Sequence, residues 1–340
     1  MAGGLFDADS AGDDSSSSAT KRQDFNREQF ASAISSEAAK SVFIGTSSWK
    51  YPGWIGTLYD EQRYLRRSRF SKAAFERECL REYAETFSTV CVDAGFYNYP
   101  QERQIEKLVE AVPSIFRFGF KVTENITVKS FPKLPRHAGR GGQQNEDFLN
   151  AEKFKKYFLN PLRSFQDSIG VLIFSFTQFS RRDFQRGRDF LPLLDRFLGE
   201  LPNDCQYAME IRNRNFLQDA YFEILKKHGV AHVYNSWTRM PSVSEQLALS
   251  ASKTTDFTVG RFLLKPGRGY EEAVKKFAPY RRAKAVYEEG RRTMADLIKQ
   301  NRKKSGKPSY IFVNNRLEGN SLQTISAVLD QLAREAAQSA

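Results

Sequence analysis

An alternation of short strand-like runs with helical patterns is the feature that most limits how this chain folds. Several of the runs are nearly continuous β-branched or aromatic segments, which is typical of parallel strands buried on both faces. The runs cover residues 42–46, 89–93, 116–122, 170–176, 206–211, 230–234, 257–264 and 309–314. Because strands and helices alternate, the eight runs predict eight parallel β/α units.

Amphipathic stripes occupy the segments between these runs. Phe75, Cys79, Tyr83 and Phe87 recur every four residues and therefore lie on one face of a helix. Further stripes lie in residues 105–112, 191–201, 222–225 and 322–332. We interpret all of them as packing faces that cover the strands, and not as cofactor-binding motifs.

A doubly wound open sheet is the main alternative to a barrel. It would be favoured by a G-x-G-x-x-G motif after the first strand, but the chain has Gly45-Thr46-Ser47-Ser48 at that place. A G-x-x-x-x-G-K-[ST] motif is also absent from the sequence. The predicted fold class is therefore α/β, as a single (β/α)₈ TIM-like barrel.

A segment of low complexity precedes the first run. Residues 7–20 are nearly all Asp, Ser, Gly and Ala, which bury too little apolar surface to offset the entropy of ordering. We expect a disordered, acidic and Ser-rich tail over residues 1–38, with a short amphipathic helix around 25–34 as an alternative for its last part. The expected domain organisation is a barrel over residues 39–340, with insertions at about 123–150 and 269–307.

The charge of the chain is unevenly distributed. The formal net charge is +12, and residues 1–40 contribute −3 of it from four basic and seven acidic side chains. Residues 261–307 hold 15 Lys and Arg against five Asp and Glu, a surplus of +10. Such a surplus favours anionic partners, either small molecules or nucleic acid, and the alternative is a basic helix that is merely solvated.

Cysteine and histidine are scarce, which limits disulfide and metal chemistry. The three cysteines, Cys79, Cys91 and Cys205, are widely spaced, so we expect neither a disulfide framework nor a cysteine-based zinc site. No run approaches the roughly 18 apolar residues of a membrane span, and the first residues lack a secretory pattern. We expect a cytoplasmic protein that does not bind membranes and requires no cofactor.

The residues expected to carry chemistry lie at the carboxyl ends of the predicted strands, where barrels build their sites. Glu210 and Arg212 are two residues apart, so on a strand their side chains point the same way. Together with Asp93 and Lys121 they are the candidate catalytic residues. Glu210 would act as general acid or base, and Asp93 and Glu210 are the pair that could hold a single Mg²⁺.

A second group of residues is expected to bind the ligand. Aromatic side chains after the first and second strands would stack on a ring, or would instead form a hydrophobic lid. Basic and amide side chains near the later strands would bind an anion, because the last two loops of barrels often hold phosphate. The candidates are Trp49, Tyr51, Trp54, Tyr97, Asn235, Arg261, Lys265, Arg268, Asn314 and Asn315.

Several short motifs together carry a resemblance to a known family. They are the block Ile44–Trp54, then Phe96-Tyr97, Phe116-Arg117-Phe118 with Lys121, Glu210-Ile211-Arg212, and Val313-Asn314-Asn315 with Gly319. Over residues 42–333 or so, the chain resembles the YecE-like family of uncharacterised barrel proteins. The resemblance implies a TIM-like barrel and no settled activity. The chain departs from the pattern of this family at Cys91, Asp93 and Val128, which indicates a divergent member.

Three functions remain open at this point. The first is a hydrolase of the phosphodiesterase type that acts on an anionic substrate, with Lys121, Arg212 and Arg261 stabilising the developing charge. The second is a nucleic-acid-binding module in which the basic segment contacts phosphates. The third is a degenerate barrel that serves as an interaction scaffold.

Overall fold

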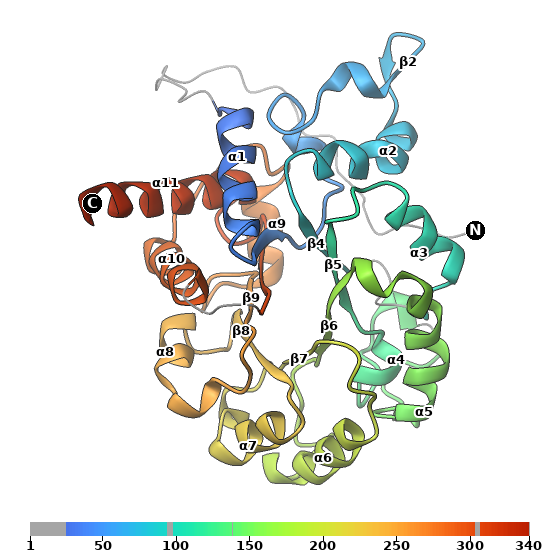
Figure 1. The fold of residues 1–340 in the computed structure, drawn as a ribbon. Coiled ribbons are helices and arrows are strands. Elements are labelled where there is room, and N and C mark those ends of the chain that lie inside the picture. Colours follow the sequence, from blue (N-terminus) through green and yellow to red (C-terminus); the bar gives the residue numbers. More distant parts are fainter. Residues whose placement is uncertain (1–24, 94–97, 138, 303–306, 340) are drawn as a thin grey trace.

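The computed structural model describes residues 25–93, 98–137, 139–302 and 307–339, and its strands close into a barrel of eight parallel strands (Figure 1). The strands are β1 (Val42–Thr46), β4 (Thr89–Val92), β5 (Arg117–Lys121), β6 (Ile169–Ser175), β7 (Tyr207–Glu210), β8 (Ala231–Ser236), β9 (Val259–Phe262) and β10 (Ser309–Val313). The barrel closes at β1, where Thr46 pairs with Val90 of β4 and with Val313 of β10. The predicted barrel is confirmed.

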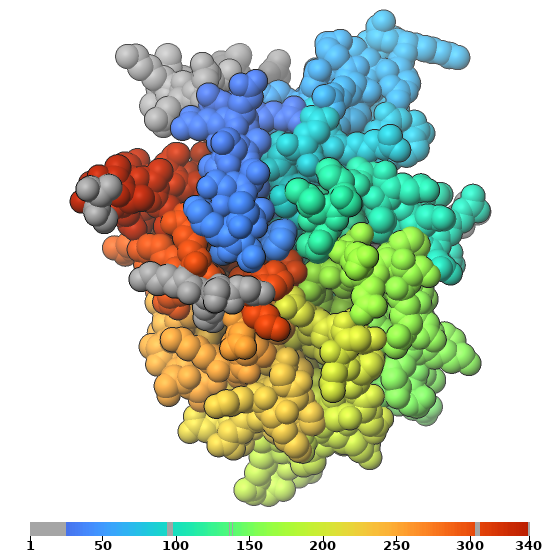
Figure 2. All heavy atoms as spheres, in the orientation of Figure 1, coloured from blue at the N-terminus to red at the C-terminus, as the bar shows by residue number. Residues whose placement is uncertain are grey.

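Helices surround the strands on the outside (Figure 1). They are α1 (Arg27–Ala38), α2 (Lys72–Ala84), α3 (Glu102–Val109), α4 (Glu124–Thr127), α5 (Ala151–Lys153), α6 (Leu191–Gly199), α7 (Asp219–Lys227), α8 (Val243–Ala248), α9 (Tyr270–Phe277), α10 (Glu288–Arg302) and α11 (Ser321–Ser339). A short hairpin of β2 (Leu65–Arg66) and β3 (Arg69–Phe70) projects from the body (Figures 1 and 2). Within the described residues, no helix combines the length and the apolar character needed to cross a membrane.

The two segments predicted as insertions differ in what they contribute. Residues 123–150 follow β5 with α4 and an irregular loop, which Asn145 fixes by donating to the carbonyls of Asn125 (2.8 Å) and Val128 (2.7 Å). Residues 269–307 contain α9 and α10. Helix α10 buries Leu297 and Ile298 against the barrel, so this part of the segment supplies the outer helix between β9 and β10.

Strand alternation produces two separate cores. Outward residues such as Ile44, Phe174 and Ile311 pack beneath the helices in a large cluster. Inward residues fill the barrel itself in a smaller cluster that includes Ile173 and Phe312. Because the side chains of a strand alternate between its two faces, a run that is apolar throughout contributes to both cores.

Gly119 of β5 makes room for an aromatic ring inside the barrel. A Cβ atom added at this position would lie 2.6 Å from Cζ of Phe312. We expect Gly119→Ala to destabilise the fold by about 1–3 kcal/mol, because the buried ring cannot move without displacing its neighbours. Urea unfolding would measure this loss, with Gly269→Ala as the control, since a Cβ there meets nothing closer than 3.7 Å. Equal stability of the two variants would contradict the prediction.

The prediction that residues 1–38 form a disordered tail is wrong for residues 27–38. Helix α1 spans Arg27–Ala38 and buries Phe30 and Ile34, whose exposed fractions are 4% and 1%. In Figure 2, α1 lies between the C-terminal helices and the segment that contains α2. The expectation for residues 1–24 falls outside the described residues.

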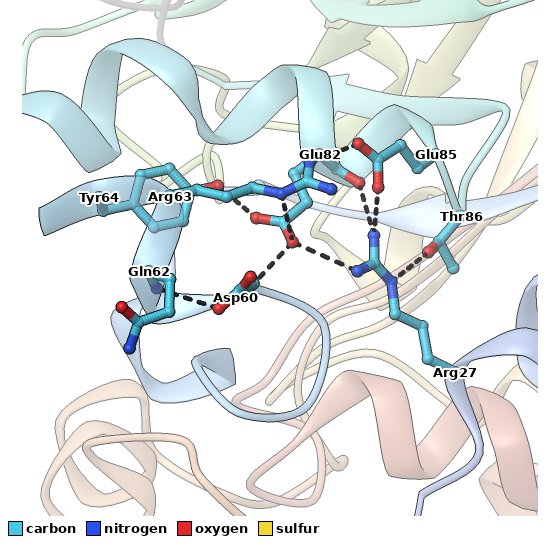
Figure 3. Close-up of polar contacts among 8 residues, drawn as sticks. All are labelled: Arg27, Asp60, Gln62, Arg63, Tyr64, Glu82, Glu85 and Thr86. Atoms are coloured by element: carbon cyan, nitrogen blue, oxygen red, sulfur yellow. Dashed lines mark hydrogen bonds and ion pairs between the residues drawn. The ribbon is translucent and has the colours of Figure 1, made fainter.

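Long-range ion pairs fix α1 on both sides. At its start, Arg27 contacts Glu82 (3.2 Å) and Glu85 (2.7 Å) of the α2 region, and the buried Glu82 also accepts a bond from Tyr64 (2.6 Å) (Figure 3). At its end, Glu37 accepts two bonds from Arg302 of α10 (2.6 and 2.5 Å). These contacts explain why a segment of weak amphipathic pattern is ordered.

Candidate functional site

The barrel interior changes from apolar to polar at the carboxyl ends of its strands. In most strands, the inward apolar residue is followed two positions later by an inward residue that is polar. These positions hold Asp93, Lys121, Ser175, Glu210, Asn235 and Arg261. The strand period of two therefore brings residues from six strands to one level at the rim.

Ion pairs join Asp93, Glu210 and Arg261 with Arg212, and the charges of all four act on Lys121 of β5. Arg261 of β9 forms an ion pair through Nη1 with Oε2 of Glu210, and its Nη2 lies 3.3 Å from Oδ1 of Asp93. Arg212 approaches Oε1 of Glu210 through Nε and Nη2, each at 2.9 Å. Since β4, β7 and β9 are not neighbours in the sheet, these contacts cross the interior. We call Asp93, Lys121, Glu210, Arg212 and Arg261 the rim cluster.

The carboxylate of Glu210 is held ionised by its surroundings. Glu210 is fully buried, and burial alone would raise its pKa. The charges of Arg261, Arg212 and Lys121 outweigh burial and bring the pKa of Glu210 well below its usual range. A carboxylate of this kind is a weak base, so Glu210 orients the two arginines and is poorly suited to proton transfer.

Lys121 has the opposite character. Burial lowers the pKa of Lys121 to about 8, with Arg212 and Arg261 acting in the same direction and Asp93 and Glu210 opposing them. An amine that titrates so close to neutral pH exchanges protons readily. Within the rim cluster, Lys121 is therefore the group best suited to act as a general acid or base.

Polar atoms near the rim cluster lack hydrogen-bond partners among the described residues. They include Nε of Arg261, Oδ1 of Asn235 and Oγ of Ser175, all of them buried. The amide nitrogen of Asn235 donates to the carbonyl of Ile211 at 3.0 Å, which fixes the side chain. Because a buried polar atom without a partner is costly, these atoms favour a polar ligand or ordered water at this place.

The aromatic candidates occupy different places from those predicted for them. Trp49 and Trp54 are buried, with exposed fractions of 5% and 0%, and pack in the core beneath the loop after β1. Their burial favours the alternative of a hydrophobic lid over stacking on a ligand. Tyr51 is partly buried, with its ring 4.8 Å from that of Trp54. Tyr97 lies outside the described residues.

The basic and amide candidates after β9 and β10 have structural partners of their own. Arg268 donates to the carbonyl of Leu317 (2.7 Å), and the exposed Lys265 has its Nζ 5.3 Å from the ring centroid of Tyr287. The last pair of candidates stabilises the turn into α11. Oδ1 of Asn314 accepts from the backbone of Arg316 (2.9 Å), and Oδ1 of Asn315 accepts from the backbone of Ser321 (2.8 Å).

Sequence reasoning missed three contributors to the rim. Trp237 lies beneath Arg212, whose Cζ is 3.9 Å from the centre of its ring. Ser175 pairs in register with Glu210. Arg316 follows the last strand directly and contacts Tyr270, as described below. Trp237 follows Asn235 by two residues, and this strand spacing could have placed Trp237 on the same side as Asn235. No local pattern in the sequence distinguishes Arg316 from the other arginines.

The residues present do not favour the Mg²⁺ site considered above. Asp93 and Glu210 both contact the guanidinium of Arg261, so a divalent ion between them would have to displace that cation. In the part of the chain that the structure describes, His, Cys, Asp and Glu side chains form no group of three or more suited to a metal ion.

The fold and the rim together define the class of protein: an eight-stranded parallel α/β barrel with a charged cluster inside its carboxyl mouth. Residues 43–340 match the family described as Protein of unknown function DUF72, so the chain belongs to this family, which is the YecE-like family suggested by its motifs. No curated protein matches it.

Solved structures of similar fold agree with this assignment. A DUF72 family protein from Thermotoga maritima MSB8 is 20% identical with a TM-score of 0.56, over 87% of this chain and 98% of that one. A DUF72 family protein from Enterococcus faecalis V583 is 14% identical with a TM-score of 0.55, over 85% of this chain and 95% of that one. At such identities the likeness shows the fold alone.

Proposed function

We propose that the protein binds an anionic, phosphate- or carboxylate-bearing ligand at the rim cluster and hydrolyses a phosphodiester there. The observation that carries this proposal is the geometry of the rim cluster, in which Arg212 and Arg261 pair with Glu210 and Asp93. Burial also lowers the pKa of Lys121, the third cation of the cluster, to about 8. Three cations against two carboxylates leave one positive charge in a mostly buried site. An anion neutralises that charge, and Nε of Arg261 offers it a donor.

Each member of the rim cluster has a role in the proposed reaction. Water attacks phosphorus, the carboxylate of Asp93 accepts a proton from that water, and the bond between phosphorus and the leaving oxygen breaks. The ammonium of Lys121 gives its proton to the leaving oxygen. Arg212 and Arg261 stabilise the charge on the other phosphoryl oxygens, and Glu210 orients both guanidinium groups.

Two measurements test the proposal. Release of 4-nitrophenolate from bis(4-nitrophenyl) phosphate reports turnover, and calorimetric titration with methylphosphonate reports anion binding. Wild-type protein is expected to show both, and Lys121→Met is expected to lose most of the turnover and to bind methylphosphonate more weakly. Unchanged binding and turnover in a folded Lys121→Met variant would overturn the proposal. Binding without turnover would leave the barrel as an anion-binding scaffold.

A second candidate function rests on a basic strip beside the rim. Residues 273–287 contain five Lys and Arg and no Asp or Glu, and these five side chains are exposed. Tyr280, within this strip, has its ring 5.7 Å from that of Tyr51, which follows β1. The strip therefore lies on the rim side, where it supports binding of a nucleic-acid backbone.

Fluorescence anisotropy with labelled single- and double-stranded DNA tests this second function. If the strip binds phosphates, affinity should fall by about 10²-fold between 50 and 200 mM salt. Replacing Lys275, Lys276, Arg281 and Arg282 by Gln should reduce the slope of log affinity against log salt by about 3 to 4. Binding that is insensitive to salt, or to these four changes, would remove nucleic acid as the partner of this surface.

A further inference from the structure

Arg316 differs from the arginines of the rim cluster because no described carboxylate neutralises it. Arg212 and Arg261 form ion pairs with Glu210, whereas Arg316 is paired with no described Asp or Glu. Its Cζ lies 4.7 Å from the ring centroid of Tyr270, and its charge acts on the neighbouring Tyr280. A partly buried guanidinium without a counter-charge is costly, and an anion would relieve that cost.

Three tyrosines from two connections of the barrel lie around this guanidinium. Tyr51 follows β1, Tyr270 and Tyr280 follow β9, and Arg316 follows β10, so all four lie on the rim side of the barrel. The rings of Tyr51 and Tyr280 are 5.7 Å apart. Tyr270 is exposed to 48%, which leaves one side of the group open to solvent.

The backbone holds Tyr280 firmly in this group. Its φ of 66° lies in the left-handed region that bulky residues rarely occupy. Its amide donates to the carbonyl of Phe277 (2.8 Å), and its own carbonyl accepts from Nδ2 of Asn320 (3.0 Å). A Cβ atom at Gly53 would lie 2.0 Å from the carbonyl oxygen of Pro279, so the loops after β1 and β9 are in close contact. The backbone at Tyr280 is thus fixed in the folded protein.

Asp93 connects this group to the rim cluster. It lies 3.3 Å from Arg261 on one side, and its charge acts on Tyr51 on the other. Burial raises the pKa of Tyr51 to about 12, with Arg316 opposing and Asp93 reinforcing the shift. The hydroxyl of Tyr51 therefore stays protonated at neutral pH and can donate to an anion beside Arg316.

We infer that Arg316, Tyr51 and Tyr280 form a second anion subsite next to the rim cluster, so that the ligand of this protein carries two anionic groups. The inference rests on the proposed function, because the first group is the one held by the rim cluster. A ligand that reaches both subsites gains from the second without a further loss of translational freedom. The half-exposed Tyr270 marks the open side, by which the second group enters.

A set of phosphonates of graded length tests the inference. Calorimetric titration near pH 7 compares methylphosphonate with alkane-α,ω-bisphosphonates of increasing chain length. For wild-type protein we expect one length to bind at least about tenfold tighter than methylphosphonate. Arg316→Gln should abolish this gain, while methylphosphonate should still bind in a manner that depends on Lys121. Tyr280→Phe retains the charge of Arg316 and should reduce the gain in part. This variant provides the test if circular dichroism shows that Arg316→Gln is unfolded.

A matched control and the remaining outcomes separate the two proposals. Arg334→Gln removes the same charge from an exposed position on α11, and it should leave the gain intact. If methylphosphonate binds in a Lys121-dependent manner but no bisphosphonate binds tighter, the second subsite is overturned and the proposed function stands. A gain that survives Arg316→Gln, or is lost equally in Arg334→Gln, overturns the subsite as well. If no phosphonate binds, both proposals fail.

Discussion

Lys121→Met is expected to lower phosphodiester turnover by about 10²–10⁴-fold and to weaken binding of methylphosphonate. The reason is that this variant removes the one amine of the rim cluster, whose pKa of about 8 lies near neutral pH, and with it one of the three cations of the cluster. The side chain of methionine fills nearly the same space, so the fold should be retained.

The pH dependence of this effect is specific to Lys121. In wild-type protein, the affinity for methylphosphonate should fall as pH rises through about 8, because the ammonium of Lys121 loses its proton there. Lys121→Met should show no such fall. Lys121→Arg keeps a charge that does not titrate, so it should bind the anion above pH 8 and still fail to donate a proton. Equal pH profiles of the wild type and Lys121→Met would contradict the assignment.

The titration of Lys121 should also affect the stability of the fold, which should rise with pH where the affinity for the anion falls. The pKa of Lys121 is about 8 in the folded chain, below the value of about 10.4 in an unfolded one. Between these values the unfolded state binds more protons, so the contribution of Lys121 to stability rises as pH increases through this window. Bound anion should oppose this trend, since it favours the ammonium.

Arg261→Met is expected to reduce the free energy of unfolding by about 3–5 kcal/mol. The variant removes the guanidinium that pairs with Oε2 of the fully buried Glu210 and leaves Arg212 at Oε1. Urea unfolding at neutral pH measures the loss. The double variant Arg261→Met with Glu210→Gln should recover part of it, because it removes the buried charge along with its partner.

A second buried ion pair provides the matched control for this experiment. Glu318 is also fully buried and accepts bonds from Arg291 (2.6 Å) and Thr324 (2.8 Å). Arg291→Met should cost a similar free energy of unfolding, but only Arg261→Met should also abolish anion binding. If both variants bind methylphosphonate equally well, Arg261 is a structural residue alone.

The difference between wild type and Arg261→Met should also depend on pH. In the folded wild type the pKa of Glu210 lies far below the value of about 4.3 found in an unfolded chain. Its contribution to stability is therefore present above that value and is lost as pH falls below it. The two proteins should converge in stability as the carboxylate becomes protonated in acid.

Local patterns were sufficient to predict the barrel and the residues that cluster at its rim. The spacing of Glu210 and Arg212 places both on one side of a strand, and strand ends in a barrel meet at one rim. Asp93, Lys121 and Arg261 were found by the same rule. This success follows from strand geometry, in which the position along the sequence determines both the direction and the level of a side chain.

Contacts that depend on the path of a loop could not be predicted in this way. Trp49 and Trp54 were expected to face a ligand, yet the loop after β1 turns them into the core. Arg316 becomes notable only when Tyr51 and Tyr280 are brought to it from distant parts of the chain. Such groups leave no periodic signal, because each loop contributes a single residue.

The attachment of α1 bears on the order in which the molecule is completed during synthesis. Helix α1 is made first, but Arg302, its partner at Glu37, lies 265 residues further along the chain. Strand β10, which closes the barrel next to β1, is made later still. The contacts of α1 with Phe87 and Glu82 involve residues made soon after it, but the contact of Glu37 and the closure of the barrel at β1 need the C-terminal part of the chain. The apolar interior of the open barrel is therefore exposed until β10 has emerged, and the growing chain depends on protection from aggregation up to that point.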